Sequence, residues 1–210
     1  YSNPDGYSYS DETVRRLAAV ETAAPDFKIM WDNAYCVHHL TDTHDVILNM
    51  LEECRKAGHE DRALMFCSLS KVTFPGAGVA AMAASRRNID YILKNMFPMI
   101  ISFDKLNQVR HIRFLKDMDG LAAHMEKHRA LLEPKFRAVL AILDEGLSGC
   151  GSIARWTKPN GGYFLSLYTL GGCAKRTVQL CREAGVVLTD AGAAYPYGVD
   201  PQDSNIRIAP

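Results

Sequence analysis

The feature that most constrains this chain is an apolar run that ends in a hydroxyl-rich stretch carrying one lysine. Residues 63–67 are Ala-Leu-Met-Phe-Cys; Ser68, Ser70 and Lys71 follow, and then Pro-Gly-Ala-Gly at 75–78. The run predicts a short buried strand, and the proline and glycines predict the turn that ends it. A lysine just past a strand end can lose its charge by burial and act as a nucleophile toward a carbonyl group. An ordinary surface lysine is the alternative that this stretch alone allows.

A second candidate residue ends another predicted strand. Residues 28–31 are a short apolar segment that predicts a strand, Asp32 follows it directly, and Tyr35 comes three residues later. Open α/β sheets place their ligands at the carboxyl ends of strands. We therefore expect Asp32 to be a buried carboxylate, which needs a partner. Capping of a loop or of the next helix is the alternative role for Asp32.

The two ends of the chain carry the remaining candidates. Residues 3–6 are Asn-Pro-Asp-Gly and predict a turn, because proline presets one dihedral angle and glycine allows a positive one. Residues 204–210 are Ser-Asn-Ile-Arg-Ile-Ala-Pro, and the short strand predicted there turns Arg207 away from both isoleucines. A plain turn at Asn3 and an exposed edge-strand arginine at Arg207 are the alternatives.

Taken in order, these four stretches resemble the motifs of the fold-type I pyridoxal-phosphate enzymes of the class I/II aminotransferase family, most closely its bacterial aspartate aminotransferase subgroup. The resemblance extends over essentially all 210 residues. It implies an α/β fold in which residues 1–112 are part of the large cofactor-binding domain, a mixed, mostly parallel sheet with helices on both faces. Residues 113–210 would form a small α+β domain with a long linking helix. Because the family's chains are longer, we expect this chain to be the C-terminal portion of a larger protein.

The resemblance also implies a catalytic set around pyridoxal 5'-phosphate. Lys71 would bond covalently to this cofactor and later carry a proton to and from the substrate. Asp32 would keep the cofactor's ring nitrogen protonated. Asn3 and Tyr35 would donate hydrogen bonds to its phenolic oxygen, and Tyr35 belongs to the catalytic residues for that reason.

The remaining implied contacts are to phosphate and to substrate. Ser68 and Ser70 would donate hydrogen bonds to the cofactor phosphate. The family often has an arginine eight residues after the lysine for this phosphate, but here that position is Val79. Arg207 would bind the substrate carboxylate through a bidentate pair, with Asn3 nearby. The departure at Val79 predicts that other groups supply the missing phosphate contact.

The implied function is transfer of an amino group from an aspartate-like amino acid to a 2-oxo acid such as 2-oxoglutarate. A β-lyase or a decarboxylase would use the same residues, because substrate orientation decides between these reactions. An aminotransferase-like sensing domain of a transcription regulator is a third reading. The family's active sites also lie between two subunits, so the resemblance implies a homodimer with shared active sites.

Composition excludes several other classes of function. Lysine plus arginine and aspartate plus glutamate are balanced at 24 each, so no basic field exists to attract nucleic acid or an anionic membrane. No apolar run approaches the ~18 residues that span a bilayer. The 6 cysteines are scattered without a Cys-x-x-Cys, which favours a reducing cytoplasm. The histidines and aspartates of residues 38–45 match no zinc spacing, so we predict no metal site.

Periodicity and capping residues predict the other elements. Helices are predicted at 10–20, 43–58, 85–95, 104–115, 121–147 and 172–185, and strands at 186–188 and 205–208. Residues 153–156 and 163–167 predict a hairpin with Asn160-Gly161 at its turn. Pro134 leaves open whether residues 121–147 form one long helix or two helices joined at that proline.

Overall fold

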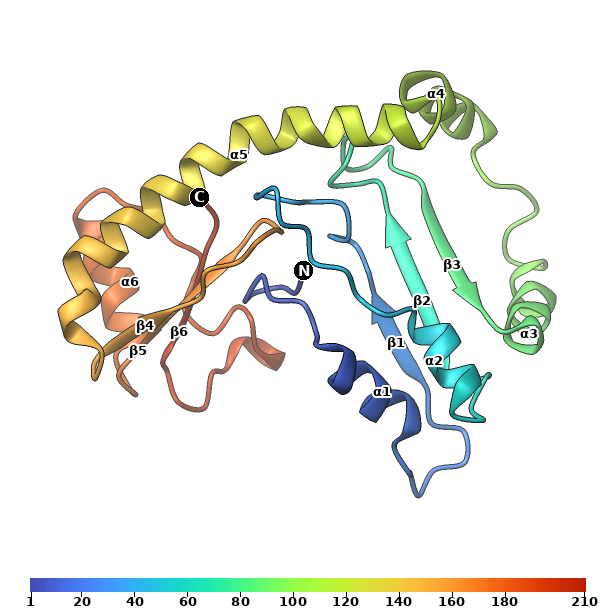
Figure 1. The fold of residues 1–210 in the computed structure, drawn as a ribbon, viewed down its shortest axis with the longest axis horizontal. Helices are drawn as coiled ribbons and strands as arrows, with labels where there is room; N and C mark the ends of the chain where they lie inside the picture. The colour runs from blue at the N-terminus through green and yellow to red at the C-terminus, as the bar shows by residue number, and fades with distance from the viewer. The chain divides into compact units, whose positions relative to one another are not determined.

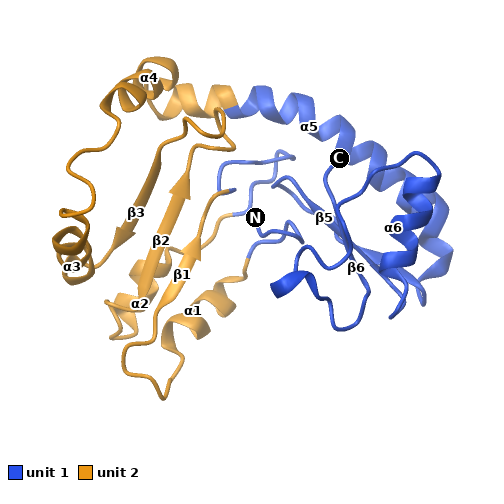
Figure 2. Ribbon diagram, turned by 180° about the vertical axis from the view of Figure 1, so that it is seen from behind, with its two compact units in different colours: residues 1–8, 35–45, 125–210 blue, residues 9–34, 46–124 orange.

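A computed structural model describes all residues, 1–210, and the chain forms two compact units (Figures 1 and 2). Unit 1 comprises residues 1–8, 35–45 and 125–210, and unit 2 comprises residues 9–34 and 46–124. Each unit combines helices with its own three-stranded sheet, so the predicted mixed α/β class is confirmed. The division into family domains after residue 112 stays a prediction.

The sheet of unit 2 consists of β1 (Ile29–Asp32), β2 (Ala63–Ser68) and β3 (Ala80–Ala84), in that order. β1 pairs with β2 in parallel, and β2 pairs with β3 in antiparallel fashion. The strands predicted around 28–31 and 63–67 are therefore confirmed. β3 is additional to the predicted elements: alanine, which supplies most of its residues, has a low strand propensity, and pairing with β2 overrides it.

Helices of unit 2 begin where polar side chains cap them. α1 (Asp11–Ala19), α3 (Arg86–Met96) and α4 (Lys105–Leu115) start after Ser10, Ser85 and Asp104, and each of these side chains accepts a hydrogen bond from an amide in the first turn. All three helices confirm the predicted ones to within a residue or two. The capping residues therefore predicted the first residue of each of these helices to within one position.

The predicted helix at 43–58 is wrong in its first half, because α2 spans only Met50–Lys56. The Asn49 side chain accepts hydrogen bonds from the amides of Leu51 and Glu52 and so sets a later start. Upstream, Asp45 accepts a hydrogen bond from the Asn160 side chain at 3.0 Å, a tertiary contact within a segment that is irregular. Helical spacing of apolar residues was present there, but local propensity yields to such contacts.

The core of unit 2 lies on one face of its sheet. Val14 and Ala18 of α1 and Met50 and Cys54 of α2 pack against Trp31 and Ala63. Because side chains alternate along a strand, Met30 and Asp32 lie on the other face of β1. Asp32 is therefore held at the carboxyl end of β1 by a strand whose opposite face is anchored in the core.

Unit 1 contains an antiparallel sheet of β4 (Ala154–Trp156), β5 (Leu165–Thr169) and β6 (Asn205–Ile208). α6 (Ala174–Glu183) lies between β5 and β6 in sequence and confirms the helix predicted to stop at Gly185. Two short 3₁₀ turns, Ser148–Cys150 and Pro196–Gly198, complete the elements. The strand predicted at 186–188 is wrong: these residues are irregular, and Val187 is exposed.

The long helix α5 (Met118–Leu147) is continuous through Pro134, so the alternative of two helices is wrong. Proline removes one hydrogen bond, but packing of Phe136 against Leu40 and Leu165 compensates on the apolar face. Residues 118–124 of α5 belong to unit 2 and residues 125–147 to unit 1. The helix also starts three residues before the predicted Leu121, because Asp117 accepts a hydrogen bond from the Gly120 amide.

The hairpin predicted at 153–167 is confirmed in its strands, β4 and β5, but not in its turn. Asn160 and Gly161 belong to a longer connection that pairs with residues 38–40 instead of closing a two-residue turn. The Leu40 amide donates to the Asn160 carbonyl at 2.8 Å, and the Gly162 amide donates to the His38 carbonyl at 2.7 Å. The Asn-Gly signal marked a close backbone approach, not a hairpin turn.

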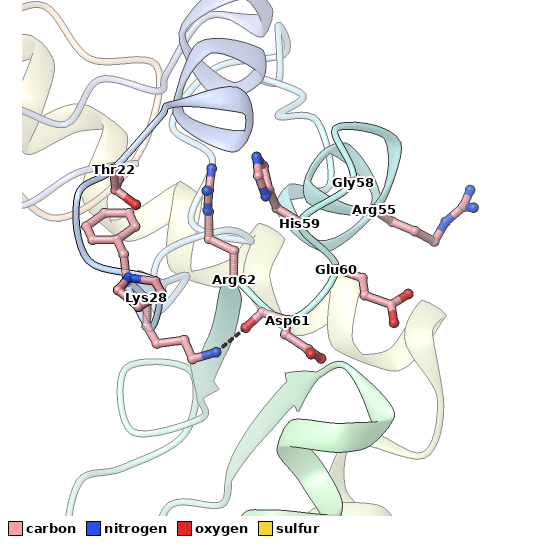
Figure 3. A pocket seen from close by; sticks show the side chains of 10 residues that line it. Thr22, Lys28, Arg55, Gly58, His59, Glu60, Asp61 and Arg62 are labelled. Carbon is pink, nitrogen blue, oxygen red and sulfur yellow. Dashed lines mark hydrogen bonds between the residues drawn. The ribbon is translucent and has the colours of Figure 1, made fainter.

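At the amino-terminal ends of β1 and β2, a polar hollow of about 450 Å³ is lined by charged side chains of unit 2 (Figure 3). Lys28 donates to the Asp61 carbonyl at 2.7 Å. Arg62 is only 8% exposed and donates from Nη1 to the carbonyls of Ala18 and Val20, each at 2.8 Å. Arg62 thus satisfies carbonyls at the C-terminus of α1 and has a structural role.

Replacing Arg62 with methionine is expected to lower the free energy of unfolding by about 1–3 kcal/mol, because the carbonyls of Ala18 and Val20 lose their partner and Ala18 is buried. Denaturant titration measures this change. The m-value, which is the slope of the unfolding free energy against denaturant concentration, should stay the same. Arg55→Met is the matched control, since Arg55 lines the same hollow but is exposed. Equal effects of the two substitutions would contradict the capping role.

Candidate functional site

The carboxyl ends of β1 and β2 bring Asp32 and the serine–lysine stretch to one edge of the unit 2 sheet. Asp32 pairs in register with Phe66, two residues before Ser68. The Asp32 side chain accepts a hydrogen bond from the Ala34 amide at 3.1 Å, which orients the carboxylate. The predicted burial of Asp32 is wrong for this chain, because the residue is exposed.

The segment from Ser68 to Lys71 is a tight turn with clustered hydroxyl groups. Ser68 Oγ donates to Ser70 Oγ at 3.0 Å and accepts from the Ser70 amide at 3.1 Å. A Cβ added at Gly78 would lie 2.8 Å from Ser70 Oγ, so only glycine lets the two segments approach this closely. Lys71 is exposed, and so these residues alone do not supply the burial predicted for it.

Val79 lies at the base of this turn. Its carbonyl accepts a hydrogen bond from the Leu69 amide at 2.8 Å, so the backbone of Val79 closes the loop that carries Lys71. The apolar side chain offers no donor to an anion. The arginine that the family often places here therefore has no substitute at this position.

A cavity of about 760 Å³ in unit 2 adjoins the same strand ends. Asp32, Cys67 and Ser68 lie on its wall, and the rest of the lining is mainly apolar. The apolar lining comes from the sheet and α3 and includes Met30, Phe66, Met82, Ile89, Ile92 and Met96. A planar ring with a basic nitrogen and an anionic substituent matches this combination of apolar wall, carboxylate and hydroxyl.

Within unit 1, Arg207 is fixed by contacts on two sides. Nη1 donates to Asn3 Oδ1 at 3.2 Å, and the guanidinium carbon lies 4.8 Å from the centre of the Phe164 ring. Arg207 Nε is buried and has no hydrogen-bond partner. A buried donor without a partner is costly unless a ligand supplies an acceptor. The arginine is therefore oriented, and its buried Nε–H is left without an acceptor.

Tyr35 belongs to an aromatic cluster in unit 1 that also contains Phe164. The Tyr35 ring lies edge-on to Phe164 and to Tyr163, with centroids 5.8 Å apart in both pairs, and to the His38 ring at 5.4 Å. Burial, followed by the nearby Tyr35 phenol, raises the pKa of Tyr163. Phe164 thus contacts both Tyr35 and Arg207 and links the two candidate residues.

The turn that carries Asn3 is tied to β5. Tyr168 donates to Asp5 Oδ1 at 2.7 Å and lies beneath the Arg155 guanidinium, 3.9 Å from the ring centre. Burial, with the hydrogen bond to Asp5 next, raises the pKa of Tyr168 to about 12. Gly6 has φ +71°, and a Cβ there would lie 2.5 Å from a Pro159 carbon. These contacts fix Asn3 near Arg207.

The structure therefore collects the predicted residues into two groups. Asn3, Tyr35 and Arg207 are linked within unit 1, and the other four, Asp32, Ser68, Ser70 and Lys71, share a strand edge of unit 2. Phe164 and Tyr168 are additions that the sequence analysis did not select. Phe164 is the second of two aromatic residues that follow Gly161-Gly162, and that aromatic pair after the paired glycines is the signal that could have identified it.

Two negative findings complete the description. No group of three or more histidine, cysteine, aspartate or glutamate side chains is arranged to hold a metal ion. None of the helices is both long enough and apolar enough to cross a membrane.

Comparison with known proteins places this geometry in context. A family described as "Aspartate amino-transferase" matches residues 1–210. A protein of Mycolicibacterium smegmatis, named only provisionally as an aminotransferase, is 50% identical over 100% of this chain and 49% of its own length. An aspartate aminotransferase of Corynebacterium glutamicum is 43% identical over 100% of this chain and 48% of its own. The chain thus spans about half the length of these relatives.

Solved structures give the same picture for the fold. The crystal structure of an aspartate transaminase from Corynebacterium glutamicum has a TM-score of 0.94 and 44% identity, and covers 100% of this chain and 49% of that one. An alpha-aminoadipate aminotransferase from Thermus thermophilus, complexed with N-(5'-phosphopyridoxyl)-L-leucine, has a TM-score of 0.76 at 22% identity. That match covers 99% of this chain and 51% of the Thermus chain, and it supports the fold alone.

Proposed function

Because the chain belongs to the aspartate amino-transferase family, we propose that the whole protein is a pyridoxal-phosphate-dependent aminotransferase. The observation that carries this proposal is the placement of Asp32 and Lys71 at the carboxyl ends of two adjacent parallel strands. That edge is where open α/β sheets bind ligands. A carboxylate and an amine at this edge are the two groups that a pyridine-aldehyde cofactor requires.

The residues at this edge fit pyridoxal 5'-phosphate. When bound, this cofactor supplies an electron sink that makes the bonds at a substrate Cα easier to break. The apolar cavity wall suits its ring, and the hydroxyls of Ser68 and Ser70 are suitable donors to its phosphate. Since Val79 offers no donor, the remaining phosphate contacts are proposed to come from parts of the whole protein beyond these 210 residues.

Each remaining residue has a distinct proposed role. Lys71 acts as the nucleophile toward the cofactor aldehyde and then moves a proton to and from the substrate Cα. Asp32 holds a proton on the ring nitrogen through a charge-assisted hydrogen bond. Asn3 and Tyr35 donate to the phenolic oxygen of the cofactor, and the surrounding aromatic cluster holds the Tyr35 ring in position.

Arg207 is proposed to bind the α-carboxylate shared by amino acids and 2-oxo acids. Its planar guanidinium matches a carboxylate, and Phe164 and Asn3 already orient it. The buried Nε, which lacks a partner, is a donor that such a carboxylate would satisfy. Binding both substrates through one arginine is what an exchange of amino groups between them demands.

Asp32→Asn is expected to leave cofactor binding largely intact and to lower the transamination rate by about 10³-fold. The amide keeps the shape of the carboxylate but lacks the charge that holds the ring proton, and removal of one such electrostatic group costs roughly 10²–10³-fold or more. Stopped-flow absorbance with the amino acid alone measures this rate. Asp26→Asn, an exposed substitution just before β1, is the control. A near-normal rate would mean that Asp32 only caps the loop at Ala34.

The proposed substrates are an aspartate-like amino acid and a 2-oxo acid such as 2-oxoglutarate. We further propose a homodimer with shared active sites and a cytoplasmic location; the resemblance to the family supports the first, and the scattered cysteines support the second. Absorbance of the whole protein tests the reaction. Aspartate alone should change the cofactor spectrum, and 2-oxoglutarate should restore it. Continuous turnover of aspartate without an acceptor would favour a lyase or decarboxylase instead.

A further inference from the structure

Two histidines outside the Lys71 turn contact the residues directly after the lysine. His111 of α4 places Nε2 2.9 Å from Thr73 Oγ1, and His124 of α5 places Nε2 2.8 Å from the Val72 carbonyl. All of these residues belong to unit 2. We infer that His111 and His124 are positioning residues, which hold the backbone after Lys71 and thereby aim its amine.

The turn is shaped so that such contacts act on Lys71. The amides of Val72 and Thr73 both donate to the Leu69 carbonyl, at 3.0 and 2.9 Å, so residues 69–73 close on themselves with Lys71 inside. Val72 is buried and cannot shift without disturbing its packing. A displacement of the Val72 carbonyl would therefore rotate the adjoining Lys71 backbone.

His111 is fixed in one orientation by its own helix. Its Nδ1 lies 2.8 Å from the Asn107 carbonyl, which can only accept, so Nδ1 carries a hydrogen. In the neutral ring, Nε2 then accepts from the Thr73 hydroxyl; in the charged ring, Nε2 donates to it and the hydroxyl turns to the Leu69 carbonyl at 3.1 Å. In both states Thr73 joins the turn to α4. The ring is 5% exposed, so water does not compete for this bond.

His124 makes the second attachment with a defined hydrogen position. The Val72 carbonyl can only accept, and so His124 Nε2 carries the hydrogen. The ring of Phe114, from the last turn of α4, lies edge-on to His124 with centroids 5.1 Å apart. Asn107 adds a third tie, because its side-chain amide donates to the Gly78 carbonyl at 3.3 Å, at the far end of the same loop. Side chains of α4 and of the start of α5 thus hydrogen-bond to both ends of the loop from Val72 to Gly78.

The test uses the whole protein and the substitutions His111→Leu and His124→Leu, with His111→Gln and His124→Gln as rescue variants. A glutamine amide reaches about as far as Nε2 and can keep the hydrogen bond, whereas leucine cannot. Thr73→Val removes the hydroxyl that His111 contacts, and Thr73→Ser retains it. His59→Leu, a histidine in the hollow at the other end of the unit 2 sheet, is the matched control.

The catalytic part of this inference rests on the proposed aminotransferase function. Each leucine variant should lower kcat by roughly 10- to 100-fold with KM for the amino acid nearly unchanged, because misplacement by about 1 Å can cost 10²-fold. The glutamine variants should recover most of the loss. The double variant His111→Leu with Thr73→Val should be no worse than Thr73→Val alone, since that change already removes the hydroxyl that His111 contacts, together with its bond to the Leu69 carbonyl.

Amide hydrogen exchange in the cofactor-free protein provides a readout independent of activity. Exchange in the peptide containing residues 69–73 should be about tenfold faster in the leucine variants, and unchanged in His59→Leu and in the glutamine variants. Wild-type kcat in both leucine variants would overturn the inference. If the wild-type protein neither binds the cofactor nor transfers amino groups, the proposed function fails. The positioning role of the two histidines is then tested by amide hydrogen exchange alone, and unchanged exchange of residues 69–73 in the leucine variants would overturn it.

Discussion

Lys71→Ala in the whole protein is expected to abolish covalent attachment of pyridoxal phosphate and to reduce turnover by at least about 10³-fold. Proton transfer by a positioned side chain contributes roughly 10²–10⁴-fold by itself, and this substitution also removes the nucleophile. The hydroxyls of Ser68 and Ser70 remain in the turn, but neither can replace an amine. Borohydride reduction followed by peptide mass spectrometry measures attachment, and an assay of amino-group transfer measures turnover.

The control for this prediction is Lys94→Ala, an exposed lysine of α3 in the same unit. It should retain normal attachment and normal turnover. A reduced cofactor adduct on any residue of the Lys71→Ala protein, together with substantial turnover, would contradict the assignment. In that case the strand-end lysine would be the ordinary surface residue that its exposure in unit 2 also permits.

Arg207→Lys is expected to lower kcat/KM by roughly 100- to 5,000-fold for amino acids and 2-oxo acids alike. Loss of one hydrogen-bonded partner from a buried charged pair costs about 3–5 kcal/mol. Lysine keeps the charge but lacks the planar fork, and it loses both the hydrogen bond to Asn3 and the stacking on Phe164. Steady-state kinetics with several amino acids measure the effect.

The cofactor spectrum without substrate should hardly change in Arg207→Lys, because the role proposed for Arg207 is to hold substrate. Arg176→Lys, an exposed change on α6 of the same unit, is the control and should behave as wild type. A loss confined to dicarboxylic substrates would mean that Arg207 recognises the side chain. No loss for any substrate would make it a structural residue of β6.

Much of the fold could be predicted because its signals are local. Ser10, Ser85 and Asp104 cap their helices through contacts within three residues, and alternation in β6 correctly turned Arg207 away from its isoleucine neighbours. The failures involve contacts distant in sequence. Residues 43–49 lose their helix to partners such as Asn160, and Asn160-Gly161 pairs with residues 38–40 instead of forming a turn.

The candidate site divides in the same way. Single positions such as Asp32 and Lys71 could be placed at strand ends, because apolar runs mark where the strands stop. Contacts between residues distant in sequence could not be predicted: Phe164 contacts Arg207 across 43 positions, and His111 contacts Thr73, in the turn that carries Lys71, across 38. Nor could exposure be predicted, since Asp32 and Lys71 lie on surfaces that these 210 residues leave open.

Transfer of ¹⁵N is the most direct measure of amino-group transfer by the whole protein. The whole protein, loaded with pyridoxal phosphate, is incubated with ¹⁵N-aspartate and 2-oxoglutarate, and the products are followed by NMR. We expect ¹⁵N-glutamate and oxaloacetate in equal amounts, with no label in ammonia, and loss of both products in Lys71→Ala. Release of labelled ammonia, formation of labelled alanine, or unaltered aspartate with a fully loaded protein would contradict it.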